Sequence, residues 1–146
     1  MNLKRITIYG FRNYEKFVSS FVPGVNLIVG DNAQGKTNLL EAIVYLSTGH
    51  SFRTRKEAEL IRFGDDFCDL QAEIELEERD QSIRAVLFRG RRQRQIYIGG
   101  VKQRNASGLQ GLMPTVLFCP EDLLILKTGA SGRRKLMDQA LSQLRP

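Results

Sequence analysis

A glycine-rich segment between an apolar run and a helix-like stretch constrains this chain more than any other feature. Residues Gly30 to Thr37 read GDNAQGKT, which has the spacing G-x-x-x-x-G-K-[ST]. The apolar residues 25–29 precede this segment, and an amphipathic stretch from Lys36 to Ser47 follows it. A strand, a glycine-rich loop and a helix in this order are the context of a phosphate-binding P-loop. The alternative is a glycine-rich turn with a helix cap, and we prefer the P-loop because both flanking elements match it.

The residue types in this loop suit a nucleoside triphosphate. Gly30 and Gly35 let backbone amides approach the β-phosphate without a Cβ in the way, and the following helix aims its positive end at the same place. Lys36 would reach the β- and γ-phosphates, and the Thr37 hydroxyl would be a ligand of the Mg²⁺ ion that bridges them. The predicted nucleotide site consists of Gly30, Asp31, Asn32, Ala33, Gln34, Gly35, Lys36, Thr37 and Asn38. The pattern by itself leaves open whether the chain is a kinase, a GTPase, a transporter-type ATPase or a DNA-repair ATPase.

The other segments predict an α/β fold in which an antiparallel β meander accompanies the P-loop unit. Alternating apolar and polar residues predict half-exposed strands, and Gly99–Gly100 predicts a tight turn. The strands of this kind are expected at residues 3–11, 15–22, 68–76, 82–88 and 94–104. The wholly apolar runs 25–29 and 115–119 predict buried strands in a sheet covered on both faces.

Two helices are expected. The P-loop helix, 36–47, has its apolar stripe at Leu39, Leu40, Ile43 and Leu46, and it ends at Gly49. A last helix is expected to begin at Ser131, a residue of the N-cap type.

Composition and charge narrow the class of protein. The chain of 146 residues is 42% hydrophobic and 26% charged, which is ordinary for a globular domain. No apolar run approaches the roughly 18 residues of a membrane span, and no signal peptide is visible. Cys68 and Cys119 are expected to be buried thiols in a cytosolic protein.

The net charge of +6 permits an anionic partner. The stretch FRGRRQRQ, residues 88–95, contains four arginines and no acid. We interpret it either as a surface for phosphates or as a solvated hairpin tip. The candidate contacts in this stretch are Arg89, Arg91, Arg92 and Arg94.

Three elements resemble the RecF family of bacterial DNA-repair ATPases, which belongs to the SMC-like heads with the ABC-type ATPase fold. The first is LKRITIYGFRNYEKF, residues 3–17, ahead of the P-loop, and the second is GHSFRT, residues 49–54. The third matches at Pro120–Glu121, Ile125–Leu126, Gly129, Arg133–Arg134 and Asp138, and departs at Thr128, Ala130 and Leu136. The resemblance implies a P-loop fold of the ABC/SMC-head type, with a mixed sheet around the P-loop helix. It also implies that Arg12 and Asn13 contact phosphate or sugar.

The resemblance further implies a function. Residues 1–128 would form the ATP-binding lobe of a RecF-like DNA replication and repair protein, and 129–146 would begin a second, helical lobe. The implied cofactors are ATP and Mg²⁺. The implied partners are DNA (gapped, single-stranded or duplex), a second copy in the ATP-bound state and recombination-mediator proteins, with no membrane. The implied setting is recombinase loading at single-strand gaps and the SOS response, in the bacterial cytoplasm at the nucleoid.

Two elements of such ATPases have no match in this sequence. No apolar strand ends in acidic residues as a Walker B motif does, and no ABC-type signature is present. We therefore expect an N-terminal piece of a longer protein, which binds ATP, hydrolyses little of it and contains no catalytic residue. Two other interpretations are a small P-loop kinase, which leaves GFRNY unexplained, and a structural SMC-type head, which predicts long heptad repeats beyond the chain.

Overall fold

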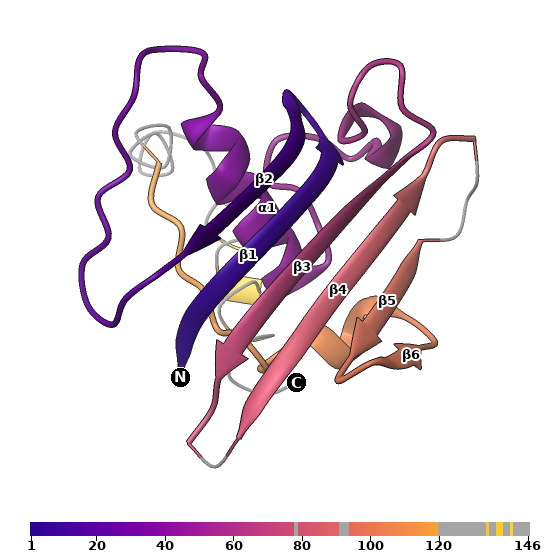
Figure 1. The fold of residues 1–146 in the computed structure, drawn as a ribbon. Coiled ribbons are helices and arrows are strands. Elements are labelled where there is room, and N and C mark those ends of the chain that lie inside the picture. Colours follow the sequence, from indigo (N-terminus) through magenta and orange to yellow (C-terminus); the bar gives the residue numbers. More distant parts are fainter. Residues whose placement is uncertain (78, 91–93, 120–133, 135–136, 139–140, 142–146) are drawn as a thin grey trace.

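The computed structural model describes residues 1–77, 79–90 and 94–119, together with Arg134, Met137, Asp138 and Leu141. Its main element is a six-stranded sheet with the order β2-β1-β3-β4-β5-β6, shown in Figure 1. Every neighbouring pair of strands in this sheet is antiparallel. The strands are β1 (Asn2–Phe11), β2 (Tyr14–Ser20), β3 (Phe67–Glu75), β4 (Asp80–Phe88), β5 (Gln95–Ile98) and β6 (Val101–Gln103). These strands confirm the predicted meander.

Alternation along the strands decides which side chains enter the core. Ile8 of β1 pairs with Leu70 of β3, and Leu70 pairs with Ala85 of β4, so these three buried residues point to one face. The opposite face carries partners such as Gln71 and Arg84. Successive residues of a strand point to opposite faces of the sheet. A sheet with one buried face therefore needs apolar and polar residues to alternate along each strand.

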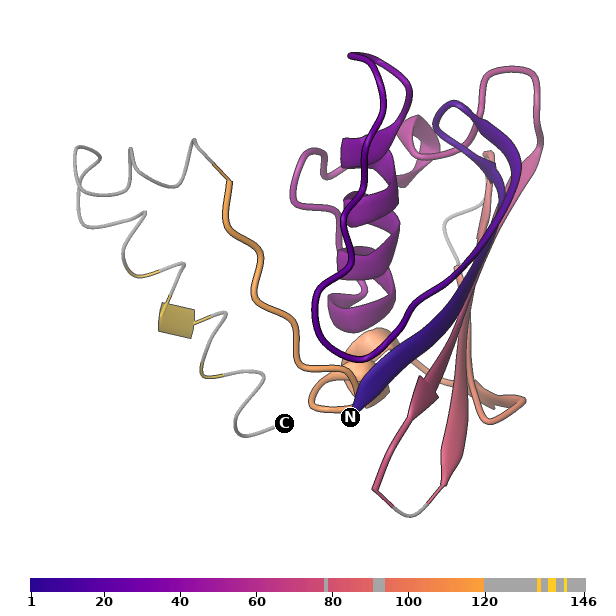
Figure 2. The ribbon, with the colours of Figure 1, turned by 60° about the vertical axis from the view of Figure 1, so that its left-hand side comes forward.

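Helix α1 (Lys36–Thr48) packs against the buried face of the sheet, as Figure 2 shows. It buries Leu39, Ala42, Tyr45 and Leu46 in the core. The predicted stripe was wrong at Leu40, which is exposed. The helix ends at Gly49, whose left-handed φ of 73° and hydrogen bond to Tyr45 O confirm the predicted C-cap.

Two short 3₁₀ helices complete the described elements: η1 (Glu57–Glu59) and η2 (Ala106–Leu109). η2 packs against α1 and β5. Within the described residues, no helix is long and apolar enough to cross a membrane.

The two apolar runs expected to be buried strands are not strands in the structure. Residues 25–29 are extended, and Val25, Leu27 and Val29 are 93%, 82% and 81% exposed. In the run 115–119, Val116 is 96% exposed and Cys119 is half-buried rather than buried. A central strand requires hydrogen-bonded neighbours, and no strand in the described part of the chain pairs with either run.

The predicted last helix and the boundary at residue 129 lie mostly outside the described residues. Within that region, Arg134, Met137, Asp138 and Leu141 are helical and exposed.

Candidate nucleotide-binding site

The N-terminus of α1 is open to an anion. The helix begins at Lys36 without a side-chain cap, and its first turn contains no acidic residue. Its first backbone hydrogen bond runs from Leu39 N to Gly35 O, 2.9 Å away. The amides of residues 36–38 therefore have no acceptor within the helix, and the helix dipole adds positive charge at the same end. Such an end can bind a phosphate.

The Lys36 side chain is folded back over the predicted P-loop. Its Nζ donates hydrogen bonds to the carbonyl oxygens of Gly30 and Asp31, at 2.6 and 2.7 Å. The loop is closed by Gln34, whose Oε1 accepts a hydrogen bond from Asp31 N at 3.2 Å. A phosphate that used the Asp31 amide would have to displace Gln34. In this structure the Lys36 ammonium group and the Asp31 backbone amide are therefore both engaged in hydrogen bonds within the loop.

Gly35 lies where the β1–β2 loop touches the P-loop. Its φ of 107° is left-handed, and a Cβ at this position would lie 2.8 Å from Asn13 Oδ1 and 3.0 Å from Tyr14 Cζ. The Tyr14 hydroxyl also donates a hydrogen bond to Gly35 O at 3.1 Å. Both the backbone conformation and the close approach therefore require glycine. The structure thus brings Asn13 to the P-loop.

Arg12 forms the other half of the β1–β2 loop. Its φ of 54° is left-handed, which is uncommon for a residue other than glycine. The guanidinium donates two hydrogen bonds to the carboxylate of Glu41, from Nε at 2.9 Å and from Nη2 at 2.7 Å. Nη1 donates a third bond to Glu59 O at 2.9 Å. A tertiary ion pair on α1 therefore holds Arg12 in its unusual conformation.

Glu41 is shared between several donors. Besides Arg12, Arg53 Nη1 lies 3.2 Å from its Oε2, and the Ser51 hydroxyl donates to its Oε1. Burial alone would raise the pKa of the Glu41 carboxyl, but hydrogen bonds from Arg12 and Ser51, together with the positive charges of Arg12 and Arg53, hold the pKa below its ordinary value. Glu41 is therefore an ionised carboxylate inside the fold.

Asn38 links this ion cluster to the P-loop. Its Nδ2 donates to Asn13 Oδ1 at 2.8 Å, and its Oδ1 accepts from Arg53 Nη1 at 2.7 Å. Since Asn13 touches Gly35, a continuous polar chain runs from the P-loop through Asn13 and Asn38 to Arg53.

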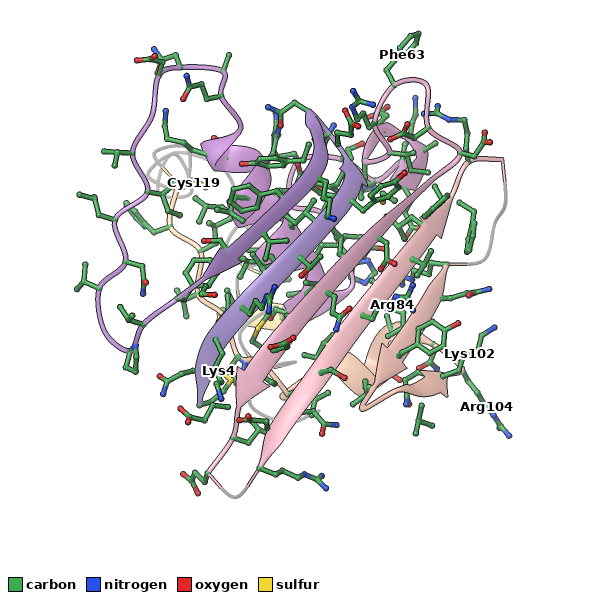
Figure 3. The ribbon with its side chains drawn as sticks, in the orientation of Figure 1. Lys4, Phe63, Arg84, Lys102, Arg104 and Cys119 are labelled. Carbon is green, nitrogen blue, oxygen red and sulfur yellow. The ribbon has the colours of Figure 1, made fainter. Side chains whose placement is uncertain are left out.

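An open pocket of about 610 Å³ lies beside this polar chain. Phe63 projects from the tip of the 62–66 loop at the edge of the molecule, as Figure 3 shows. The pocket is lined by Arg12, Asn13, Asn38, Arg53, Ala58, Glu59, Ile61, Phe63 and Arg89. Two residues of this lining also reach the P-loop region, because Asn13 lies against Gly35 and Asn38 belongs to the first turn of α1.

The residues fit a magnesium nucleotide better than a protein-bound metal ion. Within the described residues, no group of three His, Cys, Asp or Glu side chains could hold a metal. Thr37 is exposed in the first turn of α1, and a Mg²⁺ ion bound through phosphates requires few protein ligands. The Thr37 hydroxyl would hold such an ion.

The arginine-rich stretch divides into an outer and an inner part. Arg89 is exposed, and its Nε and Nη2 donate to the carbonyls of Asp65 and Arg62 at 2.8 and 3.0 Å. Arg94 is half-buried, and its Nη1 donates to Glu57 Oε1 at 2.6 Å and to the Tyr45 hydroxyl at 3.1 Å. Its guanidinium is thus engaged in intramolecular contacts at a half-buried position, where the sequence predicted an exposed one. Arg91 and Arg92 lie outside the described residues.

The sequence did not single out Glu41. This acid lies in a helix, where glutamate is common on solvated faces, and only the tertiary structure shows that it is buried. Ser51 and Arg53 belong to the segment GHSFRT, which the sequence marked by resemblance but without a role. A weak signal for Glu41 was available, because it is the one acidic residue within the otherwise uncharged helix 37–48.

Comparison with known proteins gives a consistent result. A family model described as the RecF/RecN/SMC N-terminal domain matches residues 2–124. "DNA replication and repair protein RecF" of Symbiobacterium thermophilum is 41% identical over 145 residues, which are 99% of this chain and 38% of that protein. The protein of the same name from Thermoanaerobacter sp. is 42% identical over 142 residues, 97% of this chain and 39% of its own length. The chain thus spans about two fifths of the length of these relatives.

Solved structures show the same likeness. A structure of the recombination mediator protein RecF-ATPrS in the RecFOR pathway superposes with a TM-score of 0.91 at 38% identity, over 97% of this chain and 38% of that one. The corresponding RecF-ATP structure gives a TM-score of 0.89 at 38% identity, over 97% of this chain and 39% of that one. The SMC head domain from Thermotoga maritima has a TM-score of 0.61 at 22% identity, over 71% of this chain and 39% of that one, and shows the likeness of the fold alone.

Proposed function

Because this chain belongs to the RecF/RecN/SMC N-terminal domain family, we propose that it is the ATP-binding lobe of a RecF-like DNA replication and repair protein. The observation that carries the proposal is the open N-terminus of α1 directly behind the loop GDNAQGKT, with Lys36 folded over that loop. The family resemblance favours ATP among the nucleotides, and solved RecF relatives are described with ATP.

In this proposal the phosphates bind to the amides of the P-loop and of the first turn of α1. Lys36 exchanges its contacts with Gly30 and Asp31 for phosphate oxygens, and Gln34 leaves the Asp31 amide. Arg12 and Asn13 line the pocket beside the P-loop. In this proposal they contact the phosphate or sugar. The Thr37 hydroxyl binds the Mg²⁺ ion that accompanies ATP.

The wider role is proposed for the longer protein that the relatives represent. Residues 1–128 form its ATP-binding lobe and 129–146 begin its helical lobe. Two copies join in the ATP-bound state, bind DNA and act with recombination mediators in recombinase loading and the SOS response, in the cytoplasm at the nucleoid. Arg89, Arg91, Arg92 and Arg94 are the candidates for contact with DNA phosphates. We expect the 146-residue chain itself to hydrolyse little ATP.

A calorimetric titration of the 146-residue chain with Mg²⁺-ATP tests the proposal. We expect saturable binding, weakened roughly a hundredfold by Lys36→Ala, because a charge-assisted contact to phosphate is worth up to about 3 kcal/mol. Lys102→Ala is the matched control, because Lys102 is exposed on β6, and it should leave the affinity unchanged. A folded chain that shows no binding, or a Lys36→Ala variant that binds like the original, would contradict the proposal.

A further inference from the structure

One end of the sheet face opposite α1 carries a row of aromatic rings. Tyr9 of β1 stacks on Phe67 of β3 with 5.5 Å between the ring centroids, and the Phe67 ring lies 6.4 Å from that of Phe88 on β4. Their chain neighbours Ile8 and Cys68 are fully buried, so Tyr9 and Phe67 point away from the core. Tyr9 is 44% exposed and Phe67 is 40% exposed. The row therefore presents aromatic surface to solvent.

Cations lie beside these rings on the same face. In the strand register, Lys16 of β2 is opposite Tyr9, and Lys102 of β6 is opposite Tyr97 of β5. Both lysines are exposed. The Arg84 guanidinium lies 5.8 Å from the centroid of the Tyr97 ring, and Figure 3 shows Arg84 and Lys102 together on this face. Positive charge thus accompanies the aromatic residues across the width of the sheet.

Most acids of this face lie away from the rings. Glu73, Glu75 and Asp80 belong to the far end of β3 and β4, where Glu75 is opposite Asp80. Asp69 lies closer, but Arg84 binds its carboxylate at 2.6 Å. We call the other half of the face the aromatic end, and its aromatic residues are Tyr9, Phe67, Phe88 and Tyr97. Among the described strand residues, its outward-facing charges are Lys16, Asp69, Arg84 and Lys102, which are three cations and one acid.

An excess of cations around exposed rings suits a polyanion that also offers flat apolar groups. A single-stranded nucleic acid has both, because its unpaired bases stack on aromatic side chains while its phosphates bind lysine and arginine. A duplex keeps its bases inside its own stack, so it could use the cations but not the rings. A protein partner could cover the rings, but interfaces with nucleic acids are much the more positively charged of the two kinds.

The size and position of the aromatic end fit a short length of such a strand. Neighbouring strands of a sheet lie about 4.8 Å apart, so β2 and β6 are separated by about 24 Å. Small β domains that bind single strands hold about 4–16 nucleotides. Arg89 follows Phe88 directly in the chain, so the arginine-rich stretch begins where the row of rings ends.

We propose that the aromatic end binds single-stranded DNA: bases stack on Tyr9 and Phe67, and Lys16 and Lys102 bind phosphates on either side of them. This inference rests on the proposed function for DNA as the polyanion, and it deepens that function by naming the form of DNA and the surface. The surface lies on the opposite side of the sheet from α1 and its P-loop, so it is a site of its own (Figure 2).

The test measures the affinity of the 146-residue chain for three labelled probes by fluorescence anisotropy, with and without Mg²⁺-ATP. The probes are oligothymidylate of about 15 nucleotides, an abasic strand of the same length and a duplex of the same length. We expect oligothymidylate to bind roughly tenfold or more tightly than the abasic strand, because only its bases can stack. The affinity for all three probes should fall with salt, because phosphate contacts contribute to each.

Tyr9→Ser and Phe67→Ser remove one ring each from an exposed position. Each should weaken the binding of oligothymidylate roughly tenfold and leave the affinity for the abasic strand unchanged. Tyr9→Phe keeps the ring and should bind like the original chain. Val22→Ser is the matched control, because Val22 is an apolar residue with 65% exposure outside the sheet. Thermal unfolding of each variant shows that it is folded.

Lys16→Gln and Lys102→Gln test the other half of the inference. Each removes one candidate phosphate contact and leaves the rings in place. Each should weaken the binding of oligothymidylate and of the abasic strand by the same factor, and each should reduce the dependence of the affinity on salt.

Three results would overturn the inference. These are equal affinities of the original chain for oligothymidylate and the abasic strand, unchanged binding of oligothymidylate in Tyr9→Ser and Phe67→Ser, and losses in these two variants that are as large for the abasic strand. If the two variants keep oligothymidylate but lose a purified recombination-mediator protein, the face is a protein surface and the inference is wrong. The titration with Mg²⁺-ATP decides the proposed nucleotide site separately, because none of these variants changes the P-loop.

Discussion

At the residue scale, the ion cluster around Glu41 shows how one side chain organises several others. Its carboxylate accepts hydrogen bonds from Arg12 of the β1–β2 loop and from Ser51 and Arg53 beyond the end of α1. Arg94 plays a comparable part at the other end of the helix, where it donates to Glu57 and to the carbonyl oxygen of Gly49. Arg12 thus fastens the first half of α1 to the rest of the fold, and Arg94 fastens its C-terminal end.

The ionisation of Glu41 should make stability depend on acid pH. Its folded pKa lies below the ordinary value of 4.5, so its stabilising effect is complete above that value and is lost as the pH falls through the folded pKa. We expect the free energy of unfolding, measured with urea between about pH 7 and about pH 3, to fall more steeply in the original chain than in Glu41→Gln. Glu73→Gln, on the exposed face of β3, is the control. Equal slopes in Glu41→Gln and the original chain would contradict this assignment.

At the element scale, α1 joins the nucleotide site to the core. Its N-terminus carries the P-loop amides, its middle buries Leu39, Ala42 and Tyr45 against the sheet, and its C-terminus is closed by Gly49. The P-loop is therefore held by the packing of a helix, and changes at the start of α1 affect the loop and the β1–β2 turn together.

Gly35→Ala tests this coupling. The left-handed φ of 107° costs an alanine about 1–2 kcal/mol, and the new Cβ would lie 2.8 Å from Asn13 Oδ1. We expect a lower free energy of unfolding together with weaker Mg²⁺-ATP binding. Gly100→Ala is the control, because Gly100 also has a left-handed φ, 78°, but no atom within 4 Å of the added Cβ. Gly100→Ala should lower the free energy of unfolding without weakening ATP binding. If both variants lose the same affinity for ATP, the contact with Asn13 is not the cause of the weaker binding.

At the scale of the whole molecule, the described elements cover one face of the sheet and leave the other uncovered. Figure 2 shows α1 on one side of the strands only. The extended runs 25–29 and 115–119 lie outside the sheet and leave large apolar side chains in solvent. Several large apolar side chains exposed within one short run suit an interaction surface or a tendency to associate.

Replacement of an exposed apolar residue should therefore leave the fold intact. Leu27→Ser should change the free energy of unfolding by less than about 0.5 kcal/mol and reduce the binding of a hydrophobic dye such as ANS. Leu70→Ser, a change at a fully buried residue of β3, should cost about 3 kcal/mol or more. A large loss of stability in Leu27→Ser would mean that the run 25–29 is buried in solution.

The sequence by itself determined the local features of this protein. Alternation predicted β1, β3 and β4, glycine predicted the end of α1 at Gly49, and the contiguous motif predicted the P-loop on a helix N-terminus. All of these depend on residues within a few positions of one another, where side-chain period and backbone conformation are sufficient.

Only the tertiary structure decided which distant residues meet. The partner of Arg12 is 29 positions away in Glu41, and Arg94 reaches Tyr45 across 49 positions. The sequence placed residues 25–29 inside, and the structure exposes them, whereas Arg94, expected on the surface, is half-buried. Burial and the pairing of charges depend on which segments the fold brings into contact, and a hydrophobic run becomes a central strand only where neighbouring strands accept its hydrogen bonds.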